Sequence, residues 1–373
     1  TAEDIGKSYI STFSFTSHEI GLLFGNVQSG KTGQMFGILC KAADLGFPAF
    51  LILTTDNVVL QAQTLERVKS DLEGFCICGE DDTGLFVENS LIQPAIIILK
   101  KNSRVLRKWA NIFNTTGFMK GNPLFIIDDE ADAASLNTFI NRKGNQFSSI
   151  NKYLNSIKNG ATSSLYLQVT GTPQAILLQT MASGWHPYFT YYFQPGSAYL
   201  GGDFFFPSSQ KPDCITFLET VKEDTKEAVL RHITVSAQVL ASGGKVCNGL
   251  IHPSVRQSAH NTYAKDVKKV LEWCKANNAE FKAEIIKHSA SLNPQKSAKL
   301  SYDVIFSKAE SLVMNDEINV YIMNGTNEVD SSAYAQGSNI VIGGNTLGRG
   351  VTFPGLQTIY YTRTSKKPQA DTM

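Results

Sequence analysis

One eight-residue segment constrains the fold of this chain more than any other. Gly25 to Thr32, read as GNVQSGKT, matches the pattern GxxxxGK[ST], follows the apolar run Ile20 to Phe24 and precedes helically spaced apolar residues up to Leu45. A strand, a glycine-rich turn and a helix in this order form a loop whose backbone amides surround a phosphate group. We therefore expect a parallel α/β sheet with a nucleoside triphosphate at this loop. The alternative interpretation is a glycine-rich turn without a ligand.

The residue types in this loop point to a triphosphate with a magnesium ion. Lys31 is expected to reach the β- and γ-phosphates, and the Thr32 hydroxyl is expected to bind Mg²⁺ at the start of the helix. The rest of the predicted phosphate-binding set is Gly25, Gln28, Ser29 and Gly30.

A second motif follows an apolar run further along the chain. Leu124 to Ile127 lead directly into Asp128, Asp129 and Glu130. In a P-loop protein the C-terminal end of such a strand lies beside the phosphates, where one carboxylate binds Mg²⁺ and its neighbour polarises the attacking water. We assign Asp129 to the metal and Glu130 to the water, with Asp128 as the alternative metal ligand after a shift of one residue. An acidic helix start without chemistry is the alternative interpretation.

Strand-length apolar runs alternate with helical patterns through the first half of the chain. The runs are 20–24, 49–53, 95–99, 124–127 and 165–169. Continuous apolar strands are typical of a parallel sheet that is buried on both faces, and ligands bind at the C-terminal ends of such strands. The segments Thr54 to Asn57 and Thr170 to Pro173, which follow two of these strands, are therefore expected to line the crevice that holds the P-loop.

The length of 373 residues predicts two domains. Tyr188 to Asp213 is rich in aromatic residues, glycine, proline and serine, and it is the expected junction between a domain at 1–212 and a second at 213–373. Its aromatic side chains either pack between the domains or stack bases, and we favour packing. The elements expected after it are helices at 215–240 and 263–275 and strands at 248–251, 283–286, 319–323, 340–342 and 358–361.

Charge and composition exclude several classes of protein. A net charge of +1 excludes the strongly basic surface of a simple duplex-coating protein, and the six cysteines contain no CxxC pair for a zinc site. No apolar run is long enough for a membrane span and the N-terminus lacks a signal pattern, so a soluble, cytoplasmic protein without a membrane partner is expected. A local basic stretch either contacts nucleic-acid phosphates or forms a solvated helix face. It consists of Lys100, Lys101, Arg104, Arg107 and Lys108.

Four segments together resemble motifs I, II, III and V of superfamily-two helicases. They are GNVQSGKT, Ile126 to Asp132, Val169 to Pro173 and GGNTLGRGVTF at Gly343 to Phe353. Gln28, the doubled acid before Asp132 and NGLIHPS at Asn248 to Ser254 resemble more narrowly the Z-one domain family, from about Ile20 to the last residue. That family carries an endonuclease label and belongs to the helicase-like ATPases found beside bacterial restriction and phage-defence nucleases.

The resemblance implies two RecA-like domains with ATP and Mg²⁺ as cofactors. It implies that Lys31 and Thr32 bind the phosphates and the metal, that Asp129 and Glu130 form the hydrolytic pair, and that Thr170 to Thr172 couple hydrolysis to domain motion. It also implies that Gly348, Arg349 and Gly350 face the nucleotide from the second domain. Family members continue past Met373 into a helix with an arginine finger, so the second domain is expected to be incomplete here, with Arg349 or Arg363 as the nearby substitute.

Three functions fit these motifs. The first is a nucleic-acid-stimulated ATPase motor that acts on DNA, together with a nuclease subunit from a restriction or defence system. The second is an ATP-gated assembly switch that regulates a partner nuclease without translocation. The third is cleavage of DNA by this chain, which we disfavour because its one nuclease-like pattern, Pro212-Asp213 with Asp224-Thr225-Lys226, falls on residues with helical spacing. His252, His260 and His288 show no metal-ligand spacing and are expected to be capping or surface residues.

Overall fold

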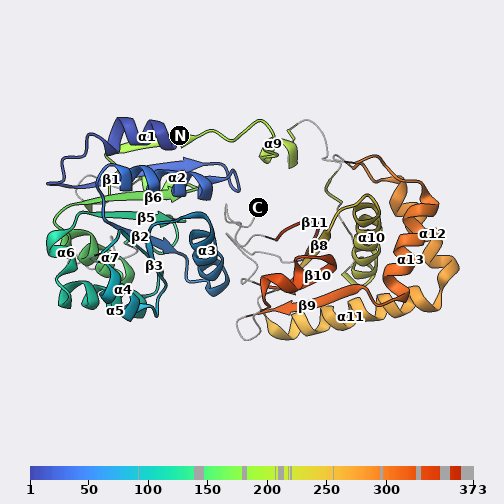
Figure 1. Ribbon diagram of the computed structural model, residues 1–373. Coiled ribbons are helices and arrows are strands. Elements are labelled where there is room, and N and C mark those ends of the chain that lie inside the picture. Colours follow the sequence, from blue (N-terminus) through green and yellow to red (C-terminus); the bar gives the residue numbers. More distant parts are fainter. Residues whose placement is uncertain are drawn as a thin grey trace. The chain divides into compact units, whose positions relative to one another are not determined.

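The computed structural model divides the chain into two compact units, Thr1–Cys214 and Ile215–Met373, drawn in Figure 1 and described here one at a time. The structure describes residues 1–90, 92–137, 147–178, 183–205, 207–208, 214–216, 218, 221–254, 256–294, 297–324, 329–344 and 353–362.

The first unit is built on a seven-stranded sheet in the order β3-β4-β2-β5-β6-β1-β7, in which every pair of neighbours is parallel. The strands are β1 (His18–Gly25), β2 (Ala49–Thr54), β3 (Cys76–Cys78), β4 (Ala95–Lys100), β5 (Leu124–Asp129), β6 (Ser164–Thr170) and β7 (Phe189–Phe193). The five strands predicted from the sequence are confirmed. The order places β1, β6 and β5 side by side, so the segments that follow these three strands share one edge of the sheet.

Helices cover both faces of this sheet, and alternate residues of its central strands point into two separate cores. Phe50 and Ile52 of β2 belong to the core on one face, whereas Leu51 and Leu53 belong to the core on the other. This two-sided burial explains why the strands read as continuous apolar runs. The helices are α1 (Ala2–Ile5), η1 (Gly6–Ile10), α2 (Lys31–Asp44), α3 (Val58–Asp71), α4 (Thr83–Asn89), α5 (Ser103–Thr115), α6 (Phe118–Gly121), α7 (Ser149–Gly160), α8 (Gln174–Leu177) and α9 (Gly202–Phe205).

The first part of the expected domain junction is an edge strand of the first unit. Phe189 and Phe193 of β7 are buried in the core of that unit, so for these two residues the expected packing between domains is wrong. Phe189 lies so close to β1 that a Cβ added at Gly21 would come within 2.2 Å of its ring. The strand β7 therefore pairs with β1 here because Gly21 has no side chain.

The second unit contains a four-stranded parallel sheet in the order β11-β8-β10-β9. Its strands are β8 (Val246–His252), β9 (Ile318–Met323), β10 (Gly337–Gly343) and β11 (Leu356–Tyr361), and its helices are α10 (Val221–Ala241), α11 (Gln257–Ala276), α12 (Asn278–Ala290), α13 (Tyr302–Met314) and the short η3 (Ser331–Tyr334). Apolar residues of the four long helices form one core with the inward side of the sheet. Both units are thus parallel α/β structures, as predicted.

One expected element of the second unit is wrong. The run Ala283 to Ile286 is not a strand but part of α12, which buries Phe281, Ile285 and His288. These residues recur at helical spacing, and a short apolar run by itself does not distinguish a strand from a buried helix. None of the helices in the described ranges combines the length and apolarity that crossing a bilayer requires.

Candidate active site

The predicted phosphate loop connects β1 to α2. Gly30 precedes the helix with φ of 93° and Gln28 has φ of 55°, both in the left-handed region. A glycine adopts this conformation at little cost, and it turns the backbone toward the N-terminus of the helix, where amide groups lack helical partners. Thr32 lies in the first turn of α2. The Ser29 hydroxyl is buried and has no hydrogen-bond partner among the described residues.

Lys31 lies within this loop and faces the acidic motif. Its ammonium group donates to the carbonyl oxygens of Gly25 at 3.2 Å and Asn26 at 2.8 Å. Burial lowers the pKa of Lys31, and the negative charges of Glu130, Asp129 and Asp132 oppose that effect. The attraction to three carboxylates shows that the loop after β1 and the motif after β5 are electrostatic neighbours.

Asp128 and Asp129 differ in their surroundings, and the difference separates their roles. Asp128 is fully buried, with Oδ1 at 2.9 Å from the Lys101 ammonium group and Oδ2 accepting from the Tyr166 hydroxyl at 2.7 Å. Both of its oxygens are thus bound by side chains of the protein. The structure does not support Asp128 as the alternative metal ligand, because a metal would have to displace a buried ion pair.

Glu130 sits in a strained turn directly after β5. Its φ of 51° lies in the left-handed region that a residue with a side chain rarely adopts. Its backbone amide donates to Asp129 Oδ1 at 3.0 Å, and the next amide, that of Ala131, donates to the Val169 carbonyl oxygen at 3.0 Å. Such strain occurs mainly at functional sites that the surrounding structure holds in place.

The threonines after β6 hold the acidic motif. Thr170 Oγ1 donates to Asp132 Oδ1 at 2.6 Å and Thr172 Oγ1 donates to Asp132 Oδ2 at 2.7 Å, while the Thr172 amide donates to Thr170 Oγ1 at 2.9 Å. These contacts favour a bracing role for the two threonines over direct contact with a nucleotide. The predicted site residues did not include Asp132. The sequence signal that could have identified it is the pair Thr170 and Thr172 at the end of β6.

Gly171 brings the segment after β6 close to the phosphate loop after β1. A Cβ added there would lie 3.1 Å from Val27 Cγ2 and 3.5 Å from Lys31 Nζ. The segments after β1, β5 and β6 therefore converge at one edge of the sheet, as the sequence pattern predicted.

This close approach gives the first testable expectation. Gly171→Ala should push the phosphate loop by a few tenths of an ångström and weaken ATP binding by about five-fold, because overpacking of this kind costs about 1 kcal/mol. Isothermal titration calorimetry with ATP would measure the effect. Gly160→Ala is the control, because a Cβ there meets nothing within 4 Å. Equal affinities for the two variants would contradict the contact.

Asp129 has a strongly perturbed carboxyl group. Burial, followed by the adjacent Glu130 charge, raises its pKa from 3.8 to about 7, while Lys101 and Lys31 act in the opposite direction. A group of this kind holds a proton near neutral pH until a cation approaches, which suits a carboxylate that exchanges its proton for a metal ion.

The raised pKa of Asp129 predicts how stability depends on pH. Between about pH 4 and pH 7 the folded state binds more protons at this group than the unfolded state does, so the contribution of Asp129 to the free energy of unfolding falls as the pH rises. Asp129→Asn cannot ionise. From about pH 5 to about pH 8, the free energy of unfolding of this variant should rise relative to that of the wild type by on the order of 2 kcal/mol. Urea unfolding of both proteins measures this, and a difference that stays constant with pH would contradict it.

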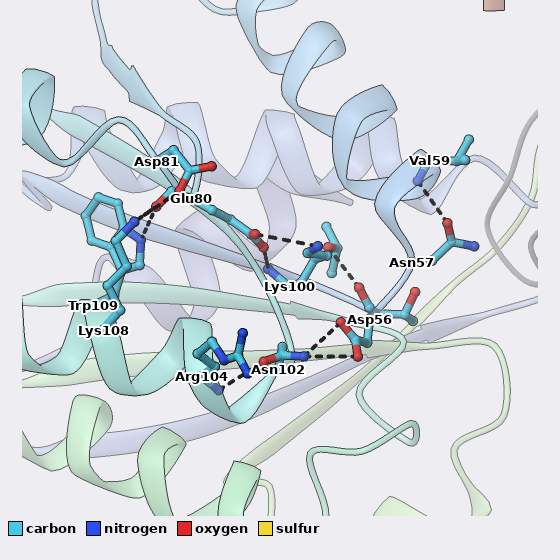
Figure 2. Close-up of polar contacts among 12 residues, drawn as sticks. Asp56, Asn57, Val59, Glu80, Asp81, Lys100, Asn102, Arg104, Lys108 and Trp109 are labelled. Carbon is cyan, nitrogen blue, oxygen red and sulfur yellow. Dashed lines mark hydrogen bonds and ion pairs between the residues drawn. The ribbon is translucent and has the colours of Figure 1, made fainter. Parts of the chain in front are cut away.

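The predicted basic stretch is largely neutralised. Lys100 lies 3.6 Å from Glu80 and Lys108 lies 3.1 Å from Asp81, and Lys101 is buried rather than presented to a ligand. Figure 2 shows the contacts of Lys100 and Lys108. Arg104 and Arg107 remain exposed on α5. For Lys101 the expected contact with nucleic acid is wrong, because its charge is used inside the protein.

Two helices begin side by side near this stretch. Asn57 caps α3, and Asn102 caps α5 by accepting from the Arg104 amide at 2.9 Å. The Asn102 side chain also donates to both carboxylate oxygens of Asp56, at 3.3 and 3.2 Å (Figure 2). These hydrogen bonds join the segment after β2 to the segment after β4.

Some of the predicted residues lie outside the described residues. They are Gly348, Arg349, Gly350 and Arg363, and also Asp213 of the nuclease-like pattern. Pro212 of that pattern also lies outside the described residues. Asp224, Thr225 and Lys226 lie in the first turns of α10, where the Lys226 ammonium group sits 3.3 Å from the centre of the Trp273 ring.

The three histidines are buried rather than on the surface. His288 lies 3.6 Å from Glu227 and 3.9 Å from Glu284, a group that sequence spacing did not reveal. Lys287 binds both carboxylates, at 3.4 and 3.2 Å, so the protein itself supplies the balancing charge.

The comparisons with known proteins agree with this arrangement. Residues 224–373 match the model of the Z1 domain. The structure of "ATP-dependent Type ISP restriction-modification enzyme LlaBIII bound to DNA" is similar with a TM-score of 0.50 and 13% identity, covering 100% of this chain and 26% of that chain. This likeness concerns the fold alone and agrees with the predicted α/β architecture.

Two further solved structures are similar at lower TM-scores. The helicase domain of Pyrococcus furiosus Hef has a TM-score of 0.41 and 12% identity over 97% of this chain and 89% of that chain. S. cerevisiae Dbp5 bound to RNA and ADP BeF3 has a TM-score of 0.48 and 14% identity over 93% of this chain and 71% of that chain. The search of curated proteins gave no match.

Proposed function

We propose, on the premise that residues 224–373 of this chain are a Z1 domain, that the protein is a helicase-like motor subunit that binds and hydrolyses ATP and acts on DNA. One observation supports this proposal more than any other. Lys31 of the phosphate loop faces Asp129, Glu130 and Asp132, and the segment after β6 contacts both motifs. A cationic motif after β1 that faces an acidic motif after β5, with only β6 between the two strands, is an arrangement suited to phosphoryl transfer to water.

The residues present fit a magnesium nucleotide. The glycine turn and the helix start of α2 offer amide groups to phosphates, and Lys31 offers a positive charge. Thr32 and Asp129 would hold Mg²⁺, which would neutralise charge on the β- and γ-phosphates. Asp128 is bound in a buried ion pair with Lys101 and Asp129 is assigned to the metal, so we assign Glu130, which directly follows them, to orienting the attacking water.

The second unit would contribute to the same reaction. Gly348 and Arg349 belong to the motif that resembles the helicase segment facing the nucleotide from the second domain. A cation beside the γ-phosphate is worth about three to five decades in turnover. Arg349, with Arg363 as the substitute, is the residue to which we assign this role.

DNA is proposed as the second ligand. Arg104 and Arg107 are exposed in the first half of α5 and offer positive charge to backbone phosphates. A nuclease subunit from a restriction or defence system is the proposed protein partner, by analogy with the proteins that Z1 domains accompany.

ATP turnover of the protein, measured alone and with single-stranded DNA, duplex DNA or RNA, tests this proposal. We expect turnover that depends on Mg²⁺ and rises with one form of DNA. Absence of both ATP binding and turnover would contradict an ATPase, and equal turnover with and without every nucleic acid would contradict the motor.

The ATP-gated assembly switch is kept as a second candidate because Glu80 and Asp81 neutralise much of the basic stretch. A surface with few unpaired cations is a weak track for a phosphate backbone. A translocation assay separates the two functions, since a switch hydrolyses ATP without moving along DNA and a motor displaces a bound block.

A further inference from the structure

We propose that Lys101 is a positioning residue, which holds the main chain of Asp129 and Glu130 in the turn that presents their carboxylates to Lys31. This inference rests on the proposed ATPase function of the same site. It assigns a role there to a lysine that lies in the basic stretch, for which the sequence suggested contact with nucleic acid. Lys101 itself makes no contact with nucleotide in this proposal.

The ammonium group of Lys101 has three N–H donors, and three oxygen atoms of the acidic motif accept from them. It donates to Asp128 Oδ1 at 2.9 Å, to the Asp129 carbonyl oxygen at 2.8 Å and to the Glu130 carbonyl oxygen at 2.7 Å. The side chain has an exposed fraction of 0%. A lysine ammonium group can make three such bonds, so this group is fully satisfied at the site where it lies.

Lys101 reaches the acidic motif from a strand that is not adjacent to it. Its backbone amide donates to the Thr54 carbonyl oxygen at 2.9 Å, directly after β4, whereas Asp128 and Asp129 end β5. The strand β2 lies between β4 and β5 in the sheet. The side chain therefore passes the end of β2, and its flexible four-carbon stem is long enough to do so.

The bonds of Lys101 divide into two kinds. The ion pair with Asp128 balances the buried charge, and Tyr166 occupies the other oxygen of that carboxylate. The bonds to the two carbonyl oxygens bind the turn itself, in which Glu130 has φ of 51°. On the other side of the turn, the Ala131 amide bonds Val169. The Ala133 amide also donates to the Glu130 carbonyl oxygen, at 2.9 Å. Removing the lysine donors would leave the strained turn without the two bonds that connect its carbonyl oxygens to the segment after β4.

Removing Lys101 alone does not separate these two roles, because Asp128 is then left as an unpaired buried charge and the protein is destabilised. The informative variant is the double change Lys101→Met with Asp128→Asn. It removes the whole ion pair, keeps an acceptor for Tyr166, and takes the lysine donor away from the Asp129 and Glu130 carbonyl oxygens.

The experiment compares melting temperature, ATP affinity and turnover for the wild type, Lys101→Met and the double variant. We expect the single variant to melt at lower temperature, and the double variant to recover most of that loss. Turnover of the double variant should stay at least about 30-fold below the wild type, with ATP affinity within about three-fold, because misplaced catalytic groups lose orders of magnitude in rate. The control is Lys158→Met, another buried lysine that donates to a carbonyl oxygen, that of Gly184 at 3.3 Å, and whose loss should leave turnover unchanged.

Hydrogen exchange provides a readout that does not depend on catalysis. Amides of residues 129–131 should exchange faster in the double variant than in the wild type, while amides of β2 keep their protection. Turnover that recovers together with stability, or unchanged exchange at 129–131, would overturn the role of Lys101. Absence of turnover in the wild type would instead contradict the proposed function, and the exchange measurement would still test the lysine.

Discussion

Lys31→Ala is expected to abolish measurable ATP binding and to lower turnover by at least about 100-fold, since it removes a positive charge preorganised for the phosphates. The side chain already lies within the loop, bonded to the Gly25 and Asn26 carbonyl oxygens, and faces the acids after β5. No large rearrangement is needed for it to meet a phosphate in that loop. Calorimetry with ATP measures the binding, and release of inorganic phosphate measures the turnover.

The matched control for this change is Lys41→Ala on the same helix. Lys41 pairs with Glu3 at 3.5 Å and is partly exposed, so its loss should change neither ATP binding nor turnover. Normal turnover in Lys31→Ala would refute the phosphate loop as the nucleotide site. A comparable loss in Lys41→Ala would show that the effect arises from the helix and not from the loop.

Glu130→Gln is expected to lower turnover by about 100-fold to 10,000-fold while ATP affinity stays within a few-fold. Glutamine has the same size as glutamate but cannot polarise water as a base, so binding and chemistry are separated. Because the variant also removes the charge that helps to raise the pKa of Asp129, any change in ATP affinity should be toward tighter binding of the magnesium nucleotide. Single-turnover hydrolysis and calorimetry measure the two quantities.

An exposed glutamate on α3, Glu66, provides the control for this variant, and Glu66→Gln should behave as the wild type. Loss of ATP binding in Glu130→Gln would show that the carboxylate supports the nucleotide site rather than the water. Unchanged turnover would remove Glu130 from the reaction and leave Asp132 as the acid to examine. The double variant with Lys31→Ala should be no slower than Lys31→Ala alone, because residues that act as a unit are not additive.

The parts of this site that were predictable from the sequence are those that local patterns specify. The glycine turn before Lys31 needs left-handed backbone at Gly30, and a central strand buried on both faces reads as an apolar run such as Leu124 to Ile127. Both signals lie within a few residues of the feature they predict. The strand predicted at Ala283 to Ile286 was wrong because three apolar residues in a run of four do not define a period. The helix became visible only from the burial of Phe281 and His288 together with Ile285.

Long-range contacts decided the roles of the charged residues. Lys101 sits in a run of basic residues, and nothing near it in the sequence indicates that its partner is an aspartate 27 positions away. Asp128 and Asp129 are adjacent acids, and a register shift of one residue would exchange their predicted roles. The contacts of Asp128 with Lys101 and Tyr166 favour Asp129 as the metal ligand, which stays a prediction. The roles of Gly348 and Arg349 stay predictions.

The sequence by itself determined five strands of the first unit, the glycine turn between β1 and α2 and the strand end that bears acids, because turn residues and apolar runs are set by residues close together in the chain. Only the tertiary structure decided which charged side chains are paired inside the protein and which remain exposed. The order β4-β2-β5 brings Lys101 to Asp128, and the neighbouring strands β5 and β6 bring Asp132 to Thr170 and Thr172. A buried charge is stable only beside a partner, and sheet order, which no local pattern encodes, supplies that partner.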